Sequence, residues 1–424
     1  MSSAVKVLPT RSSPSTSRGA RAMPQAQPSG PAPADLPRSA DAIRRHNDEV
    51  LAVWAAYRAG RPTRVPVIIG TNTRYFLLGE QAPFRHIDFK EYTLDPDLMF
   101  DTQVAIQEWQ RTHLLQDAPM GLPAEEDGWS VNVDFQNFYE AGWFGCEVAF
   151  FDGQVPDTHP RFTAPERKRE IIAQGDLDPF GGLMADVKTY YDCFRARAET
   201  FEHRGRKVRQ VSPRGLGTDG PLTVAANLRG ATELFTDFIE DPEYVHELLA
   251  YVTTQTIRRI KAWRKYLGQP ERQPFGFADD SVQLISQKMY REFVLPCHRR
   301  LKAELSSTPE GGSIHLCGDA SRHFKTIVDE LKIDRFDTGF PINHGAVRRA
   351  LGPAVEILGG PHVELMRNGT AAEVYAAATG VLESGICEGG RFILREGNNL
   401  APDTPLENVA ALHRAARDVG VYPA

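Results

Sequence analysis

A histidine and a cysteine in the C-terminal half of the chain have the spacing of a metal-binding pair. His315 and Cys317 stand two residues apart in a β-rich run, directly before Gly318. Residues two apart in a strand face the same side, so both side chains would project together at the strand's C-terminal end. Imidazole and thiolate are ligands that zinc prefers. The alternative is a buried cysteine that packs as a small apolar group beside a hydrogen-bonded histidine.

Paired carboxylates follow another β-rich run. Asp279 and Asp280 are adjacent, so one side chain should enter a pocket while the other caps the next turn. The inward residue, for which we favour Asp280, would exchange a proton or orient a metal-bound histidine. Asp337, at the end of a later run, is a similar candidate. The alternative is that both members of the pair cap turns.

The elements that must position these residues are short β-rich runs that alternate with amphipathic helices. Strands separated by helices require parallel crossovers, and eight such units close naturally into a (β/α)8 barrel. The predicted fold class is therefore α/β, a (β/α)8 TIM-type barrel whose site lies at the C-terminal ends of the strands. Capping signals predict helices over residues 241–268, 370–385 and 404–420. The eight candidate strands are residues 65–69, 131–135, 222–226, 275–278, 313–317, 335–338, 355–358 and 392–395.

Two regions depart from this rhythm. Residues 1–38 are rich in Pro, Ser and Arg and poor in large apolar side chains, which predicts a disordered tail, with an organelle transit peptide as the alternative. Residues 39–424 then form the barrel domain. Within it, residues 80–215 are less regular, and we expect an insertion that packs over the barrel mouth. Its basic run at 204–214 is interpreted as a solvated loop.

Composition excludes several classes of protein. The chain has 424 residues and a formal net charge of -6, which argues against nucleic acid as a main partner. Its apolar runs are far shorter than the roughly 20 residues of a membrane helix, so no membrane span is expected. The five cysteines are too scattered for a disulfide framework and favour a reducing cytoplasm.

Motifs throughout residues 64–424 resemble the uroporphyrinogen decarboxylase superfamily, which also contains zinc-dependent methyltransferases that act on corrinoid proteins and thiols. The resemblance implies a (β/α)8 barrel, in agreement with the rhythm of strands and helices. The motifs that carry it are Arg64-Val-Pro-Val67, Gly145-Cys-Glu-Val148, Gly220-Pro-Leu-Thr223, Asp241-Pro242-Glu243, Tyr290-Arg-Glu-Phe-Val-Leu-Pro296, His315-Leu-Cys317-Gly318, Asn368-Gly-Thr370, Gly390-Arg-Phe-Ile-Leu394 and Asp403-Thr-Pro-Leu-Glu-Asn408.

Resemblance to the methyltransferase branch implies that His315 and Cys317 are metal ligands. That branch has a further cysteine after a glycine in the last strand's loop, where this chain has Asn398. A neutral amide oxygen is a poor substitute for a thiolate on zinc. The other candidates for the third ligand are His362, Glu364 and Cys387. We favour His362, because the preceding glycine pair lets the backbone approach and its loop borders the same mouth.

The decarboxylase branch carries an Arg-Gln-Ala-Gly-Arg-Tyr segment after the first strand that grips substrate carboxylates. This chain keeps only Arg74 and Tyr75 of that segment. The branch also places a carboxylate at the end of the second strand, and Asp134 is the nearest match, two residues early. In this reading Arg74 and Asp134 are catalytic.

Three functions remain open from the sequence. The leading hypothesis is metal-assisted methyl transfer that involves a small substrate, a thiol or a corrinoid, with zinc as the metal. The alternatives are a metal-free uroporphyrinogen or aromatic-acid decarboxylase and a catalytically inactive barrel that binds small molecules. The expected partners are a small-molecule substrate, a corrinoid protein and a second copy of the chain. The predicted substrate contacts are Tyr75, Asp279, Asp337 and Asn398.

Overall fold

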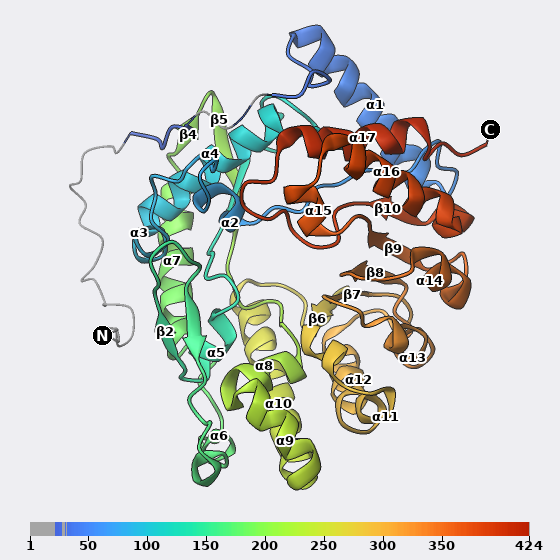
Figure 1. The fold of residues 1–424 in the computed structure, drawn as a ribbon. Coiled ribbons are helices and arrows are strands. Elements are labelled where there is room, and N and C mark those ends of the chain that lie inside the picture. Colours follow the sequence, from blue (N-terminus) through green and yellow to red (C-terminus); the bar gives the residue numbers. More distant parts are fainter. Residues whose placement is uncertain (1–21, 28–29, 31, 424) are drawn as a thin grey trace.

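One side of the molecule is a sheet of five parallel strands. The computed structural model describes residues 22–27, 30 and 32–423. The strands lie in chain order, each bonded to the next, and the helices between them lie on the outside (Figure 1). The strands are β6 (Gly276–Ala278), β7 (Ser313–Leu316), β8 (Arg335–Thr338), β9 (Glu356–Gly359) and β10 (Phe392–Leu394), and the helices are α12 (Leu295–Leu305), α13 (Ser321–Leu331), α14 (His344–Leu351), α15 (Val363–Asn368) and α16 (Ala371–Val381).

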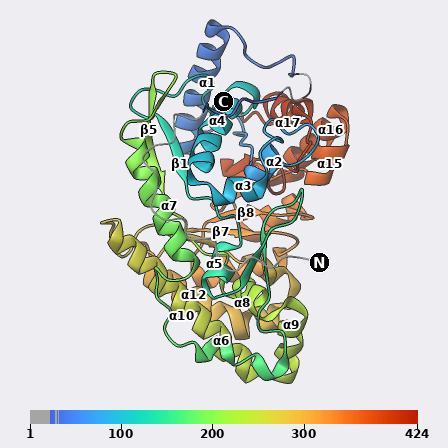
Figure 2. The ribbon, with the colours of Figure 1, turned by 90° about the vertical axis from the view of Figure 1, so that its left-hand side faces the viewer.

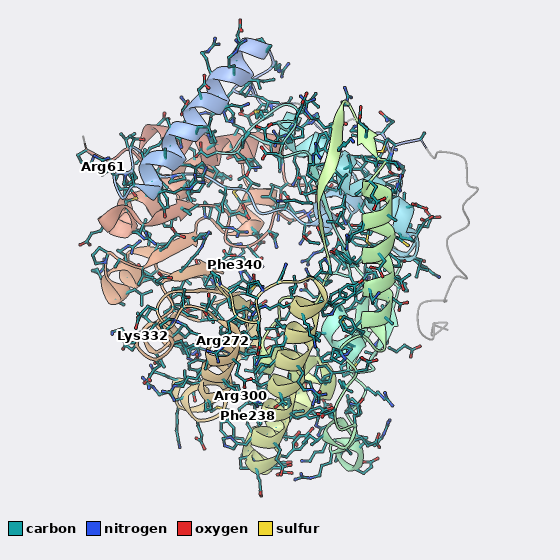
Figure 3. All side chains as sticks on the ribbon, turned by 180° about the vertical axis from the view of Figure 1, so that it is seen from behind. Arg61, Phe238, Arg272, Arg300, Lys332 and Phe340 are labelled. Carbon is teal, nitrogen blue, oxygen red and sulfur yellow. The ribbon has the colours of Figure 1, made fainter. Side chains whose placement is uncertain are left out.

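Three further segments complete a ring of eight strand positions. β1 (Trp129–Asn132) pairs in parallel with β5 (Arg206–Ser212). Beyond β5, the Thr218 carbonyl accepts a backbone hydrogen bond from Ala278 of β6. At the other edge, Val67 forms a parallel bridge with Leu394 of β10, so residues 65–69 occupy the first position. The fold is the predicted (β/α)8 barrel, and side chains fill the layer between its strands and helices (Figure 3).

The third strand position differs from the prediction. Residues 222–226 belong to helix α8 (Pro221–Arg229), and β5 is the third strand instead. A short apolar run does not distinguish a buried helix from a buried strand, and Pro221 in the first turn favours the helix. The run was predicted as a loop because most of its side chains are charged or polar. In the structure Val208 is the one buried residue of this strand.

The three predicted helices are present, although the capping box predicted for the last of them is not formed. α10 (Pro242–Tyr266) begins after Asp241, whose carboxylate accepts the Tyr244 amide. α16 begins with the predicted capping box between Thr370 and Glu373. α17 (Leu406–Asp418) lacks the box predicted at Thr404, since that hydroxyl donates to the Ala401 carbonyl instead.

Ordered structure begins before Ser39. Leu36 is buried in a small cluster with Leu115, Met120 and Ala410. The Asp35 carboxylate lies 2.8 Å from the Arg414 guanidinium. The barrel therefore includes the end of the segment assigned to the tail, whereas residues 1–21, 28, 29 and 31 lie outside the described residues.

The region at 80–215 is more regular than an insertion. It contains the barrel strands β1 and β5 and the barrel helices α4 (Pro96–His113) and α7 (Leu183–Ala198). The elements added to the barrel plan are short: the antiparallel pair of β2 (Glu147–Ala149) and β3 (Asp157–His159), and the helices α5 (Tyr139–Trp143) and α6 (Glu170–Ala173).

The terminal helices cover one side of the ring. α1 (Ala40–Arg58) and α17 lie close together in both ribbon views, away from α9 (Ala231–Glu240) (Figures 1 and 2). Arg417 of α17 reaches Glu49 of α1 at 3.3 Å. Within the described part of the chain, no helix combines the length and apolar character needed to cross a membrane.

A buried ion pair ties the first strand position to the loop after α4. The Asp117 carboxylate accepts two hydrogen bonds from Arg64, at 2.6 and 2.7 Å, and one from the Val67 amide. Both side chains are almost fully removed from solvent, at 9% and 0% exposed. Removing one partner of such a pair leaves an uncompensated buried charge.

We therefore expect Asp117→Ala to lower the free energy of unfolding by about 3–5 kcal/mol, measured by urea denaturation. The matched control is Asp41→Ala, because Asp41 pairs with Arg44 in full contact with solvent. An exposed pair of this kind contributes about 1 kcal/mol or less. If both variants lost the same free energy of unfolding, the Arg64–Asp117 pair would not be the stabilising interaction described above.

Candidate metal centre at the mouth of the barrel

The structure brings His315, Cys317 and Asp280 together at the C-terminal ends of neighbouring strands. His315 lies in β7, Cys317 follows it, and Asp280 follows β6 at the start of the 3-10 segment η2 (Asp280–Leu284). His315 Nε2 is 3.1 Å from Cys317 Sγ and 3.7 Å from Asp280 Oδ1. One ligand atom from each of the three residues lies within 4.8 Å of the other two. The same Asp280 oxygen accepts the Cys317 amide at 2.8 Å, which fixes the carboxylate beside the sulfur.

Asp337 orients the histidine ring. His315 and Asp337 are direct partners in the register of β7 and β8, and Nδ1 of the ring lies 2.8 Å from Asp337 Oδ2. Because the carboxylate binds Nδ1, the other ring nitrogen, Nε2, is directed toward the sulfur. Histidines that bind metals through one ring nitrogen are commonly oriented by a carboxylate on the other. The structure thus gives Asp337, predicted as a substrate contact, a role that acts through His315.

Arg395 holds Asp337 in turn. It follows β10, and its Nη1 lies 3.0 Å from each oxygen of the Asp337 carboxylate. Its Nη2 donates to Glu396 Oε1 at 2.9 Å. A Cβ added to Gly70 would run into the Arg395 guanidinium and the Glu396 carboxylate, so the guanidinium fits only because residue 70 has no side chain.

The protonation states follow from these contacts. Burial acts to lower the pKa of His315, but its hydrogen bonds with Asp337 and Cys317 raise it to about 10. Burial and the charge of Asp280 raise the pKa of the Cys317 thiol, although His315 acts in the opposite direction. Burial acts to raise the pKa of Asp337, but its contacts with His315 and Arg395 lower it overall. The pKa shifts of His315 and Cys317 both favour the protonated forms, so binding of a cation to these two ligands would release protons.

The donor set fits a catalytic zinc ion. Zinc takes nitrogen, sulfur and carboxylate ligands, and catalytic sites use three protein ligands with one open position. His315, Cys317 and Asp280 supply these three ligand types, and Asp337 supplies the outer partner of the histidine. The side chains of His315 and Asp280 remain 28% and 38% exposed, so a substrate could reach the centre.

The candidates for a third ligand lie in different places. Asn398 is at the centre, with its Nδ2 3.3 Å from Cys317 Sγ. His362 caps α15, where its Nδ1 accepts the Glu364 amide, and its ring packs on Phe340. Cys387 makes its hydrogen bond away from the centre, because its thiol donates to the Leu382 carbonyl. The third potential ligand in the structure is therefore Asp280, whereas the sequence analysis favoured His362.

The structure also places the three residues that were predicted from the decarboxylase motifs, and two of them are engaged within the fold. Both oxygens of Asp134 accept hydrogen bonds from neighbouring side chains, those of Thr73, Tyr92 and Gln136. Tyr75 is buried, and its hydroxyl donates to the Thr404 carbonyl. Arg74 lies in α2 (Thr73–Leu77), and its Nε is buried without a hydrogen bond among the described residues.

Asp279 is the outward member of the carboxylate pair. It is fully buried, and its oxygens accept the amides of Leu222 and Thr223 at the start of α8. Its Oδ2 also lies 2.9 Å from His298 Nε2. The prediction that one member enters the pocket while the other caps a turn matches Asp280 and Asp279 in the structure. A contact between Asp279 and a substrate stays a prediction, and in the structure its carboxylate is engaged by protein groups.

Sequence reasoning missed Asp219 and Arg395. Asp219 lies in the segment between β5 and α8, directly before Gly220, and its backbone amide donates to Glu140 Oε2 at 2.6 Å. Burial and the charge of Glu140 raise its pKa to about 7, with Asp280 among the other charges that act on it. Placing the third strand at 222–226 put Asp219 at the wrong end of a strand. Arg395 is the last residue of the strand predicted at 392–395. Its position at the C-terminal end of a barrel strand could have indicated that it lies at the site.

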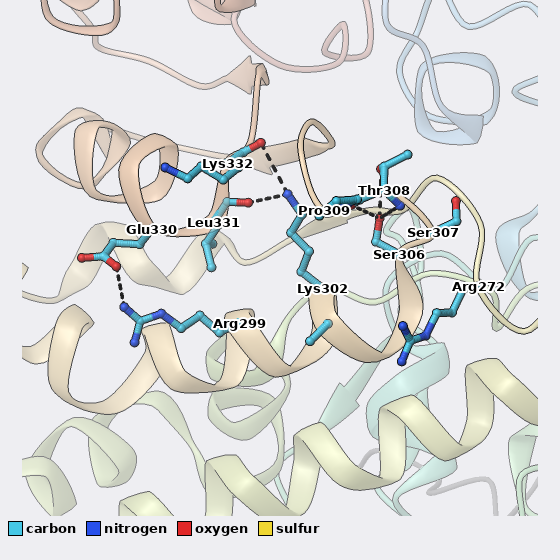
Figure 4. Close-up of a pocket in the computed structure, with 11 residues that line it drawn as sticks. Arg272, Arg299, Lys302, Ser306, Ser307, Thr308, Pro309, Glu330, Leu331 and Lys332 are labelled. Atoms are coloured by element: carbon cyan, nitrogen blue, oxygen red, sulfur yellow. Dashed lines mark hydrogen bonds and ion pairs between the residues drawn. The ribbon is translucent and has the colours of Figure 1, made fainter.

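A hollow of about 450 Å³ lies at the opposite end of the barrel (Figure 4). It is bordered by the segments that precede β6, β7 and β8, including Arg272, Lys302 and Lys332. The Lys302 ammonium donates to the Gly311, Leu331 and Lys332 carbonyls, and Arg299 pairs with Glu330. Lys302 and Arg299 hold α12 to α13 and to the segments beside it, and the hollow is separate from the candidate centre.

The class of protein is therefore a (β/α)8 barrel with potential metal ligands at the C-terminal ends of its strands. Residues 127–419 match the uroporphyrinogen decarboxylase (URO-D) family profile. A methylated-thiol–coenzyme M methyltransferase of Methanosarcina mazei is 32% identical over 304 residues, which span 69% of this chain and 73% of that protein. The chain belongs to the uroporphyrinogen decarboxylase family, and its relatives support a methyltransferase-type enzyme.

A solved structure supports the fold separately. A methyltransferase from Methanosarcina mazei superposes with a TM-score of 0.57 at 19% identity, over 87% of this chain and 98% of that one. At this identity the likeness concerns the architecture alone. It agrees with the ring of eight strand positions described above.

Metal analysis tests the centre. We expect protein reconstituted with zinc and then desalted to keep about one zinc ion per chain, and His315→Ala and Cys317→Ser to keep little. The matched control is Cys193→Ser, a half-buried thiol on α7. Full zinc content in both site variants would contradict the assignment.

The packing of Arg395 over Gly70 gives a second prediction. We expect Gly70→Ala to displace the guanidinium, release Asp337, and lower zinc affinity by about 10- to 100-fold, as for loss of an outer-shell partner. Zinc affinity is measured by competition with a chelator. Gly380→Ala is the control, because an added Cβ at Gly380 of α16 meets open space. Unchanged affinity in Gly70→Ala would show that Arg395 does not support the centre.

Proposed function

We propose that this enzyme transfers a methyl group between a donor and a small-molecule thiol, with a zinc ion held by His315, Cys317 and Asp280. The observation that carries the proposal is the convergence of these three ligand types within 4.8 Å at the mouth of the barrel. When bound, zinc would hold the acceptor thiol as a thiolate near neutral pH. The thiolate, its proton already lost to solvent, would form a bond to the methyl carbon as that carbon's bond to the donor breaks, and the donor would leave with the electron pair of the broken bond.

The protein's own contribution is to hold the ligands in one arrangement. Asp337 keeps Nε2 of His315 directed at the centre through the hydrogen bond to Nδ1. Arg395 keeps Asp337 ionised and in place by donating to both of its oxygens. Asp280 is fixed by the Cys317 amide. Ligands that are already positioned need little rearrangement when a metal and a substrate arrive.

The choice of a thiol rests on the relative that acts, by its name, as a methylated-thiol–coenzyme M methyltransferase. Its likeness to this chain supports sulfur chemistry at a similar centre. A corrinoid carried by a protein partner is our proposal for the methyl donor, and a methylated thiol is the other donor class. Assembly with a second copy of the chain stays a prediction.

The decarboxylase alternative has less support. Asp134 would have to act on substrate, but three protein side chains already donate to its carboxylate. Tyr75 donates into the fold. Arg74 is then the one residue of that motif left to grip a carboxylate, and a substrate with several carboxylates needs several such groups.

The test is a methyl-transfer assay on zinc-loaded protein, with methylcobalamin or a methylated thiol as donor and a small thiol as acceptor. We expect wild type to form the thioether, Cys317→Ser to form none, and Asp337→Asn to lose about 10- to 100-fold in kcat/KM. Asp41→Asn, on the exposed face of α1, is the control.

Other outcomes identify the alternatives. Carbon dioxide release from an aromatic or porphyrinogen acid that survives Cys317→Ser and fails in Arg74→Ala would establish the decarboxylase. Tight ligand binding without any product across donors and acceptors would establish a binding protein. Either result would overturn methyl transfer.

A further inference from the structure

Asn398 stands against the sulfur of the centre, and its hydrogen bonds fix which way its amide points. Its Nδ2 lies 3.3 Å from Cys317 Sγ. Its Oδ1 accepts the Asn399 backbone amide at 2.8 Å. Its backbone carbonyl accepts Arg395 Nη2 at 2.8 Å, so the residue is tied at both the main chain and the side chain.

The two ends of the amide are not interchangeable here. The Asn399 backbone N–H is a donor, so the atom that faces it must be the amide oxygen. The NH2 group must then face the sulfur. An amide NH2 has two donor hydrogens and no acceptor lone pair for a metal. Asn398 therefore cannot be a ligand while the Asn399 hydrogen bond is kept.

We propose that Asn398 donates an N–H···S hydrogen bond to the metal-bound Cys317 sulfur, so that the metal is held by one thiolate rather than two. The inference rests on the proposed function only in requiring that a metal binds at His315 and Cys317. Asn398 is a positioning residue, because it acts on the metal through the sulfur.

The consequence is a more electron-poor metal. Each thiolate donates charge to the ion, and a hydrogen bond to the one remaining sulfur withdraws part of that charge. A carboxylate from Asp280 in place of a second thiolate acts in the same direction. An electron-poor metal binds an incoming thiol strongly and favours its thiolate form.

Cobalt substitution reports both features directly. Co²⁺ occupies zinc sites, and its sulfur-to-metal charge-transfer absorption grows with the number of thiolate ligands. We expect the wild-type band to have the intensity of one thiolate and Asn398→Cys to double it. Asn398→Leu, which removes the N–H···S bond at similar size, should keep that intensity and move the band to longer wavelength.

The control is Asn399→Ala, which keeps the backbone amide that orients Asn398 and should leave the band in place. A shift in the ligand-field bands of Asn398→Leu, with the charge-transfer band unmoved, would show that Asn398 ligates through oxygen and would overturn the proposal. Wild-type intensity equal to that of Asn398→Cys would overturn it as well.

Failure of the proposal is distinguishable from failure of the proposed function. If Asn398→Cys binds cobalt and wild type does not, a second thiolate is required and the role given to Asn398 is wrong, while the centre itself stands. If neither protein binds cobalt, the metal-assisted function fails together with the proposal.

Discussion

The hydrogen-bonded chain from Arg395 through Asp337 to His315 is the interaction on which the site depends. It joins residues from β10, β8 and β7, so it must pass the end of β9. Gly359 and Gly360 stand there, and an added Cβ at Gly360 would run into the Arg395 backbone. A side chain at Gly360 would therefore displace the backbone from which the Arg395 side chain extends.

The same residues close the barrel. Glu396 Oε1 accepts the Gly70 amide at 2.9 Å and also the Arg395 guanidinium, so the first and last strand positions meet at the group that holds Asp337. Burial raises the pKa of Glu396 to about 7, and the charge of Arg395 limits that shift. Closure of the ring and orientation of His315 are therefore coupled, because one guanidinium serves both.

The sequence predicted features that depend on local patterns of residues, and it did not predict which groups meet in the fold. The strands that carry His315 and Asp337 are short β-rich runs in the regular C-terminal half of the chain, and both the strands and the pairing of His315 with Cys317 are found in the structure. The strand at 222–226 failed because its apolar run suits a buried helix equally well. That error also hid Asp219. The protein partners of Tyr75 and Asp279 could not be predicted, because periodicity places a residue on an element but does not say which polar group inside the fold will bind it.

The sequence by itself determined the βα rhythm, the family motifs and the pairing of an imidazole with a thiol on one side of a strand, since these depend on residues close together in the chain. Only the tertiary structure decided that Asp280 is a potential third ligand in place of His362, that Asp337 holds the ring, and that Asn398 turns its NH2 toward the sulfur. Those contacts join residues dozens of positions apart. They arise from strand register and from the closure of the ring, which no local pattern encodes.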